Sequence, residues 1–160
     1  YFDESGFCLT PPIPYAWQEI GETIEVPSGD TRRLNVVGLL SRKQQLSAWT
    51  FEASINSDVV IACLDAFCET LTKDTVVVMD NASFHRSHAV EDKILEWEAK
   101  GLTLFFLPKY SPELNLIEIL WRFMKYVWIE FGAYKGWKHL IEYVEDVIIH
   151  YGTKYVINFV

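Results

Sequence analysis

Three acidic residues of this sequence have the type and spacing to bind divalent cations. Asp3 lies in a predicted first strand, Asp80 directly follows a short apolar run, and Glu118 lies in the first turn of a predicted long helix. Ligands gather at the carboxyl ends of strands in open α/β sheets, and carboxylate oxygens suit hard cations such as Mg²⁺. Two such ions can activate a water or a 3′-hydroxyl and stabilise the leaving oxygen of a phosphodiester.

Spacing alone does not single out these three residues, because a chain with 22 acidic residues contains many such triples. Glu113 is a second candidate for the third position. Helix geometry favours Glu118, which lies about 100° from Ile117 at the edge of the apolar stripe. Glu113 belongs to a turn begun by Pro112, which is a looser platform for a site. The alternative role for Glu118 is a capping box with Asn115 as N-cap.

The elements that must position these acids are predicted from hydrophobic periodicity and turn residues. Strands 33–40 and 46–53 are expected to form an antiparallel hairpin, and Asn56 or Ser57 is expected to cap the first helix. The other predicted elements are a first strand 1–9, a short hairpin 17–26, strands 75–79 and 102–107, and helices 86–100, 116–131 and 137–151. Helix 116–131 is expected to have Ile117, Trp121, Met124 and Trp128 as its buried centre, with Val127 among the other apolar positions at helical spacing, and most tryptophans are interpreted as core packing.

Composition indicates one domain spanning 1–160, since 50% of the residues are hydrophobic and 22% charged. The longest uncharged stretch, 5–18, contains three prolines, so no membrane span is expected. The net charge of −8 argues against a simple nucleic-acid-binding module, but not against an enzyme whose cations supply positive charge. Three cysteines without a Cys-x-x-Cys pattern indicate reduced thiols in a cytoplasmic protein. The first residue, Tyr1, suggests a fragment of a longer protein.

The sequence motifs around the three acids identify a family more specifically than the acids alone. FDESGF at 2–7, VMDNASFH at 78–85 and LPKYSPELNLIE at 107–118 occur in this order. Together they resemble the DDE catalytic domain of the IS630/Tc1/mariner superfamily of transposases, the IS630-like bacterial branch in particular. The resemblance covers nearly the whole chain, and the chain departs from it at Leu116, where the family has proline. Proline in a first helical turn only presets a backbone angle, so leucine should cost little.

That resemblance implies a ribonuclease-H-like α/β fold, with a mixed five-stranded sheet whose first three strands are antiparallel and whose last strands are parallel. It implies that Asp3, Asp80 and Glu118 are catalytic and bind two Mg²⁺ or Mn²⁺ ions. The implied reaction is cleavage at transposon ends followed by 3′-hydroxyl transfer into target DNA at a TA dinucleotide. The family further implies a homodimer that synapses two ends, a bacterial cytoplasmic location, and an N-terminal helix-turn-helix region that is expected in the parent protein outside these 160 residues.

Other polar residues lie close to the acids in the sequence. Candidate contacts to DNA phosphates or bases are Lys109, Tyr110, Arg122 and Lys125. Candidate contacts to metal-bound water or phosphate are Asn81 and His85. The alternatives are a solvated loop at 109–110, turn and capping chemistry at Asn81, and an i,i+4 pair between Glu118 and Arg122.

Two other functions share much of this pattern. One is a ribonuclease-H-like metal-dependent nuclease that cuts without strand transfer. The other is a domesticated, non-catalytic remnant that contacts DNA or protein, although all three carboxylates are in place. Because clustered acids repel one another, Asp80→Asn is expected to leave the metal-free fold intact or more stable.

Overall fold

The computed structural model describes residues 1–12, 19–21, 29–109 and 111–159. The predicted hairpin 17–26 and the candidate residue Tyr110 therefore fall wholly or mainly outside the described residues. The three cysteines are free thiols. Within the described ranges, no helix has the length and apolar character to cross a membrane.

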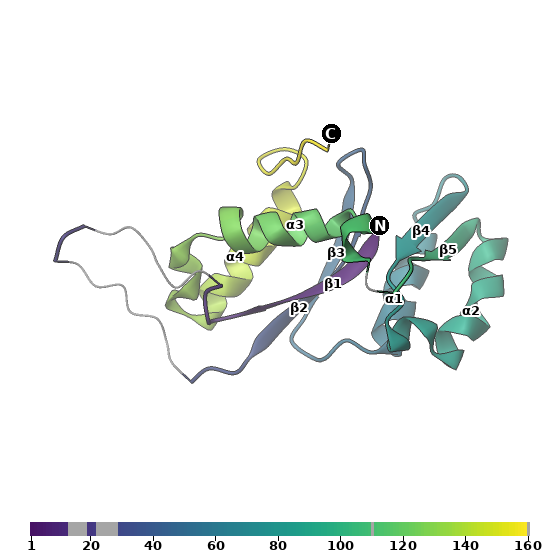
Figure 1. Cartoon of the computed structure of the whole chain (residues 1–160), viewed down its shortest axis with the longest axis horizontal. Coiled ribbons are helices and arrows are strands. Elements are labelled where there is room, and N and C mark those ends of the chain that lie inside the picture. Colours follow the sequence, from purple (N-terminus) through teal and green to yellow (C-terminus); the bar gives the residue numbers. More distant parts are fainter. Residues whose placement is uncertain (13–18, 22–28, 110, 160) are drawn as a thin grey trace.

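The first sheet contains three antiparallel strands in the order β1 (Phe2–Cys8), β2 (Arg33–Leu40) and β3 (Leu46–Phe51), as shown in Figure 1. The predicted hairpin of β2 and β3 is confirmed. The register sets Asp3 opposite Gly38. A Cβ atom on Gly38 would lie 2.9 Å from Cη2 of Trp121, so the glycine makes room for this ring directly across from Asp3.

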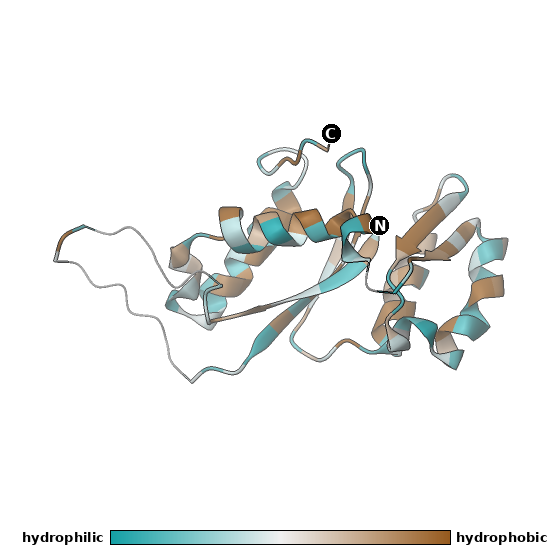
Figure 2. Ribbon diagram, viewed as in Figure 1, coloured by the Kyte–Doolittle hydropathy of each residue, from teal (hydrophilic) through white to brown (hydrophobic). Residues whose placement is uncertain are grey.

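The middle of the chain alternates helices with two parallel strands. Helix α1 (Ser57–Cys68) begins at the predicted cap, because the Asn56 side chain accepts a hydrogen bond from the backbone N–H of Val59. Strands β4 (Thr75–Met79) and β5 (Leu102–Phe106) pair in parallel, and Figure 2 colours both as hydrophobic. A 3-10 turn (Ser83–Arg86) and helix α2 (His88–Ala99) connect them.

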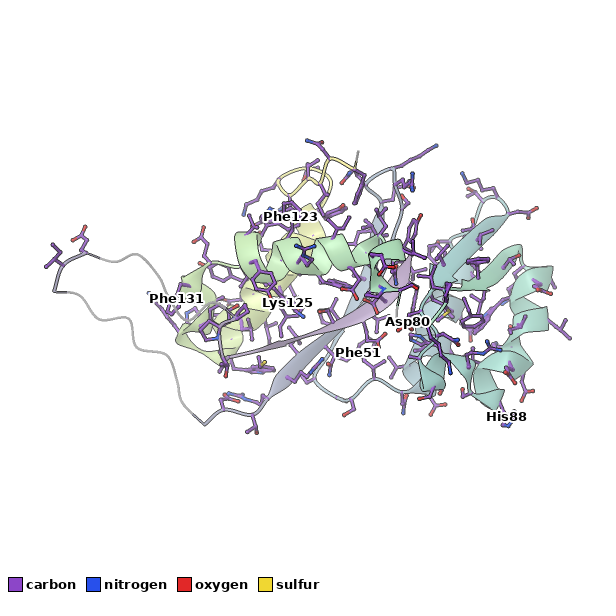
Figure 3. The ribbon with its side chains drawn as sticks, in the orientation of Figure 1. Phe51, Asp80, His88, Phe123, Lys125 and Phe131 are labelled. Atoms are coloured by element: carbon purple, nitrogen blue, oxygen red, sulfur yellow. The ribbon has the colours of Figure 1, made fainter. Side chains whose placement is uncertain are left out.

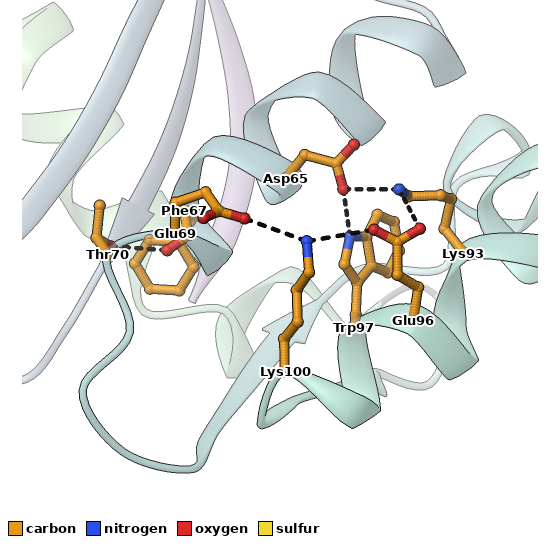
Figure 4. A network of polar contacts seen from close by, with 8 residues as sticks. All are labelled: Asp65, Phe67, Glu69, Thr70, Lys93, Glu96, Trp97 and Lys100. Carbon is orange, nitrogen blue, oxygen red and sulfur yellow. Dashed lines mark hydrogen bonds and ion pairs between the residues drawn. The ribbon is translucent and has the colours of Figure 1, made fainter.

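Charged residues link α1 to α2 on the surface (Figure 4). The indole N–H of Trp97 donates to Asp65 at 2.8 Å, and Lys93 lies 3.1 Å from the same carboxylate. Lys100 pairs with Glu69 at 3.1 Å. These contacts join the two helices at the surface.

The C-terminal half differs from the prediction at one helix. Helix α3 (Ile117–Phe123) is followed by a π-helical turn (Met124–Trp128), a 3-10 turn (Phe131–Lys135) and helix α4 (Trp137–His150). The predicted helix 116–131 is therefore too long. In the π turn the N–H of Ile129 bonds to the carbonyl of Met124, five residues back. In this wider turn Met124 of the predicted buried centre is buried, whereas the apolar residue Val127 is 63% exposed.

Two separate apolar clusters lie against the sheets. The first, here the α3 cluster, unites β1 and β2 with α3 and α4, and includes Phe7, Val36, Ile117, Leu120 and Val144. The second, here the β4 cluster, unites β1 and β2 with α1, α2, β4 and β5, and includes Phe2, Val37, Leu64, Met79 and Trp97. Strand β2 is buried along nearly its whole length because its alternate side chains enter different clusters.

The hydrogen bonds divide the strands into a three-stranded antiparallel sheet and a two-stranded parallel sheet. The expected strand directions are confirmed, and β1 lies against β4. One continuous five-stranded ladder is not formed by the described residues. The two sheets meet where Asp3 and Asp80 are found.

Candidate active site

One cavity of about 390 Å³ is lined by all three predicted acids. Asp3 comes from β1, Asp80 from the loop that leaves β4, and Glu118 from the first turn of α3. Glu113 is exposed on a 3-10 turn and does not line this cavity. The other lining residues are Asn81, Ala82, Pro108, Lys109, Ser111, Pro112 and Asn115.

Asp3 is the most buried of the three acids, with 8% of its surface exposed. Its Oδ2 accepts a hydrogen bond of 3.0 Å from the indole N–H of Trp121. Burial, followed by the charges of Glu4 and Glu118, raises the pKa of Asp3 from 3.8 to about 8. Trp121, a tryptophan that its sequence position assigns to core packing, therefore also orients this carboxylate.

Asp80 is held by a different set of partners. Its Oδ1 lies 2.6 Å from Nδ1 of His85 and accepts a hydrogen bond from the N–H of Ala82. His85 is fully buried, and its Nε2 lies 3.3 Å from Oε2 of Glu4. His85 therefore connects β1 to the loop after β4. It does not line the cavity itself, whereas Asn81 does.

The hydrogen bonds of these groups shift two pKa values. The bond from His85 holds the pKa of Asp80 below its usual value. Burial lowers the pKa of His85, but the bonds to Asp80 and Glu4 outweigh it and raise the pKa to about 9. The negative charge of Asp80 is stabilised by His85, so we now expect Asp80→Asn to keep the fold but to lower, rather than raise, the stability of the metal-free protein. The repulsion among the acids acts on Asp3 instead.

Asn115 does not cap α3 as predicted. The helix has Leu116 at its N-cap, without a side-chain cap bond. The backbone N–H of Asn115 donates to the carbonyl of Pro112, so it does not serve a capping box with Glu118. The Asn115 side chain turns toward β1, where its Nδ2 donates to the carbonyl of Phe2 at 2.9 Å.

The donor set has the chemistry for a hard divalent cation, since the cavity carries three carboxylates and the amide of Asn115. The Oδ1 of Asn115 is buried and has no hydrogen-bond partner among the described residues. Nevertheless, within those residues no three His, Cys, Asp or Glu side chains stand close enough to hold a metal as they are placed. Cation binding would therefore require the carboxylates to draw together, with Asp80 the one held by His85.

The predicted DNA contacts are spread unevenly around the cavity. Lys109 is exposed and lines it, and Arg122 is exposed on α3. Lys125 lies well apart from Asp80 in Figure 3, with its Nζ 5.5 Å from the ring centre of Phe7. Burial and the nearby Arg33 lower the pKa of Lys125. No ion pair joins Glu118 to Arg122 in the described part of the chain.

The free energy of unfolding of the metal-free protein is expected to fall as the pH rises from about 4 to about 8. Over this range folded Asp3 keeps a proton that the unfolded chain releases, so the folded state binds more protons. His85 acts in the same direction between its ordinary pKa of 6.5 and about 9. Melting temperatures measured in EDTA across this range test the slope, and a melting temperature that rises with pH contradicts it.

A family model described as DDE superfamily endonuclease matches residues 1–141. The chain is 29% identical over 75 residues to the uncharacterised protein y4pE/y4sA of Sinorhizobium fredii (strain NBRC 101917 / NGR234), covering 47% of this chain and 46% of that one. The aligned part is thus about half of the relative.

Two solved structures share the fold. A Mos1 transposase paired-end complex with the left transposon end matches with a TM-score of 0.65 and 14% identity, over 96% of this chain and 48% of that chain. A Mos1 mariner paired-end complex with Mn matches with a TM-score of 0.63 and 15% identity, over 92% and 47%. This chain spans about half the length of each Mos1 chain.

Proposed function

Because this chain belongs to the DDE superfamily endonucleases, we propose that it is the catalytic core of an IS630-like transposase of the Tc1/mariner type. The observation that carries the proposal is the single cavity lined by Asp3, Asp80 and Glu118. The fold shared with Mos1 transposase supports it, as do the three sequence words that surround the acids. The two sheets then correspond to the halves of a ribonuclease-H-like sheet, in one domain spanning 1–160.

The proposed cofactor is a pair of Mg²⁺ or Mn²⁺ ions held by the three carboxylates. When bound, such ions activate the attacking oxygen and stabilise the leaving oxygen of a phosphodiester. The presence of Mn in one matching Mos1 complex supports this assignment. Burial and the neighbouring carboxylates raise the pKa of Asp3, and a bound cation would supply the positive charge that offsets them.

The residues of the chain itself prepare the site for this chemistry. Trp121 holds the Asp3 carboxylate through its indole N–H, and Asp3 would bind a cation in its deprotonated form. His85 positions the Asp80 carboxylate through the 2.6 Å contact at its Nδ1, and Asp80 would be one of the residues that hold a cation. Lys109 at the cavity rim, with Arg122 and Lys125 along the helical segment, would neutralise DNA phosphates.

The proposed partners are transposon ends and target DNA with a TA dinucleotide, bound by a homodimer. The matching Mos1 structures are paired-end complexes, one with a left transposon end, which supports DNA as the substrate. The net charge of −8 supports weak, salt-sensitive binding by this chain alone. Recognition of specific ends is assigned to a helix-turn-helix region of the parent protein, acting in the bacterial cytoplasm.

A strand-transfer assay tests the proposal. The full-length protein is incubated with its own pre-cleaved transposon end, a target plasmid and Mn²⁺, and joined products are sequenced. We expect 3′-end joining at TA sites that disappears in EDTA. Cleavage of uncleaved ends without joining would identify a nuclease instead. Absence of both reactions, together with no cation binding by calorimetry, would identify a non-catalytic remnant.

A further inference from the structure

Asn115 is a buried polar residue beside the three carboxylates, and the proposed cation site does not include it as a ligand. Only 3% of its surface is exposed, and it lines the same cavity as Asp3, Asp80 and Glu118. Its backbone is fixed on both sides, since its N–H donates to Pro112 and its carbonyl accepts from the N–H of Glu118. These bonds hold the backbone of Asn115, and the bond from its Nδ2 to the carbonyl of Phe2 holds the side chain.

The orientation of the Asn115 amide follows from its neighbour. The carbonyl oxygen of Phe2 can only accept a hydrogen bond, so the arm of the amide that lies 2.9 Å from it is the nitrogen. The other arm is therefore the oxygen, Oδ1. The carbonyl of Phe2 lies on the edge of β1 away from β2, because the N–H and carbonyl of the preceding Tyr1 face Leu40 of β2.

The Oδ1 atom is buried and lacks a hydrogen-bond partner among the described residues. Buried acceptors in folded proteins are almost always satisfied, so an acceptor without a partner on a residue that lines a cavity points to a ligand. The cavity already carries three carboxylates. A further oxygen from a neutral amide adds a ligand without adding to their mutual repulsion, and amide oxygens are ordinary ligands of hard cations.

We propose that Oδ1 of Asn115 is a fourth oxygen ligand of the divalent-cation site, while its Nδ2 ties the site to β1. This inference rests on the proposed function, because it needs the cation. It explains why the amide sits three residues before Glu118 and bonds to the residue directly before Asp3. One side chain thereby links the two elements that carry the first and third acids.

Calorimetric titration of the metal-free chain with Mn²⁺ alone tests the proposal, with no DNA and no activity measurement. Asn115→Leu keeps the approximate volume but removes both polar arms, and we expect it to weaken Mn²⁺ binding about tenfold or more. Asn115→Asp keeps an oxygen where Oδ1 stands and loses the donor to Phe2. We expect this variant to bind Mn²⁺ at least as tightly as the parent, while its metal-free melting temperature falls.

Asn35 is a matched control. It is also a buried asparagine, but both arms are used, with Nδ2 donating to Ala53 and Oδ1 accepting from Arg33. It does not line the cavity. Asn35→Leu should lower the melting temperature and leave Mn²⁺ affinity unchanged. Circular dichroism identifies which variants fold.

The outcomes separate this inference from the proposed function. If the parent binds Mn²⁺ and a folded Asn115→Leu binds it equally well, Asn115 is not a ligand, although the proposed function stands. If Asn115→Asp binds Mn²⁺ more weakly than the parent, the amide acts only through Phe2 and the inference is overturned; this variant decides alone if Asn115→Leu does not fold. If the parent binds no Mn²⁺, the proposed function fails together with the inference.

Discussion

A Glu118→Gln variant is expected to cut DNA roughly a thousandfold more slowly than the parent while keeping its fold. Glu118 lines the cavity together with Asp3 and Asp80, and glutamine preserves its shape but removes the charge that a cation needs. Glu118 does not form a capping box with Asn115, because the N–H of Asn115 is already bonded to the carbonyl of Pro112. A loss of activity in Glu118→Gln therefore cannot be attributed to a lost helix cap. The measurement is Mn²⁺-dependent nicking of supercoiled plasmid, with circular dichroism to verify the helices.

Glu113→Gln is the matched control for this experiment. Glu113 lies five residues earlier in the same sequence word but is exposed and outside the cavity. Its substitution should leave the nicking rate within about twofold of the parent, since surface changes far from the site have small effects. A fully active Glu118→Gln enzyme, or an inactive Glu113→Gln enzyme, would refute the assignment of the third acid.

In the metal-free protein, Asp3→Asn and Asp80→Asn, made separately, are expected to change the free energy of unfolding in opposite directions. Asp3→Asn should raise the free energy of unfolding at pH 7.5 by on the order of a few kcal/mol, because the folded state no longer has to keep a proton that the unfolded chain releases. Asparagine can still accept the hydrogen bond from Trp121. In contrast, Asp80→Asn should lower stability, since His85 is fully buried and loses a charged partner at 2.6 Å.

Thermal melts in EDTA measure both changes, and for a chain of this size 1 kcal/mol corresponds to about 2–4 °C. Adding Mn²⁺ provides the control. The parent should gain stability, by about 2.7 kcal/mol at a hundredfold excess over the dissociation constant, whereas Asp3→Asn should gain little. Equal melting temperatures of the parent in EDTA and in Mn²⁺ would contradict cation binding. A destabilised Asp3→Asn would show that the carboxylate at this position is structural.

Much of the fold is predictable from the sequence because its signals are local. The apolar run 75–79 forms strand β4, with Val77 and Met79 buried and Val76 exposed, and the Asn56 side chain caps α1. The turn after α2 ends at Gly101, whose φ of 85° is readily adopted by glycine alone. Each of these features depends on a few adjacent residues, so periodicity and turn chemistry identify it.

The contacts that build the site are not local, and the sequence alone did not reveal them. Trp121 bonds to Asp3 across 118 positions, and Asn115 bonds to Phe2 across 113. Both had local interpretations, as packing and as a helix cap, that fitted their immediate neighbours. A usable signal was present for Trp121, which follows Glu118 by three residues and so shares its side of the helix. Glu4, which faces His85, had no such signal.

The three acids are attached to elements that pack in two different apolar clusters. Asp80 follows Met79 of the β4 cluster, Glu118 follows Ile117 of the α3 cluster, and Asp3 lies on the strand that contributes to both. Partial unfolding of either cluster would dismantle the site while the other kept its packing. A cation bound by all three carboxylates must be released before either half can open, so loading the site should make the two halves unfold as one cooperative unit. Amide hydrogen exchange should then slow in α2 and α4 alike, although neither helix contributes one of the three acids.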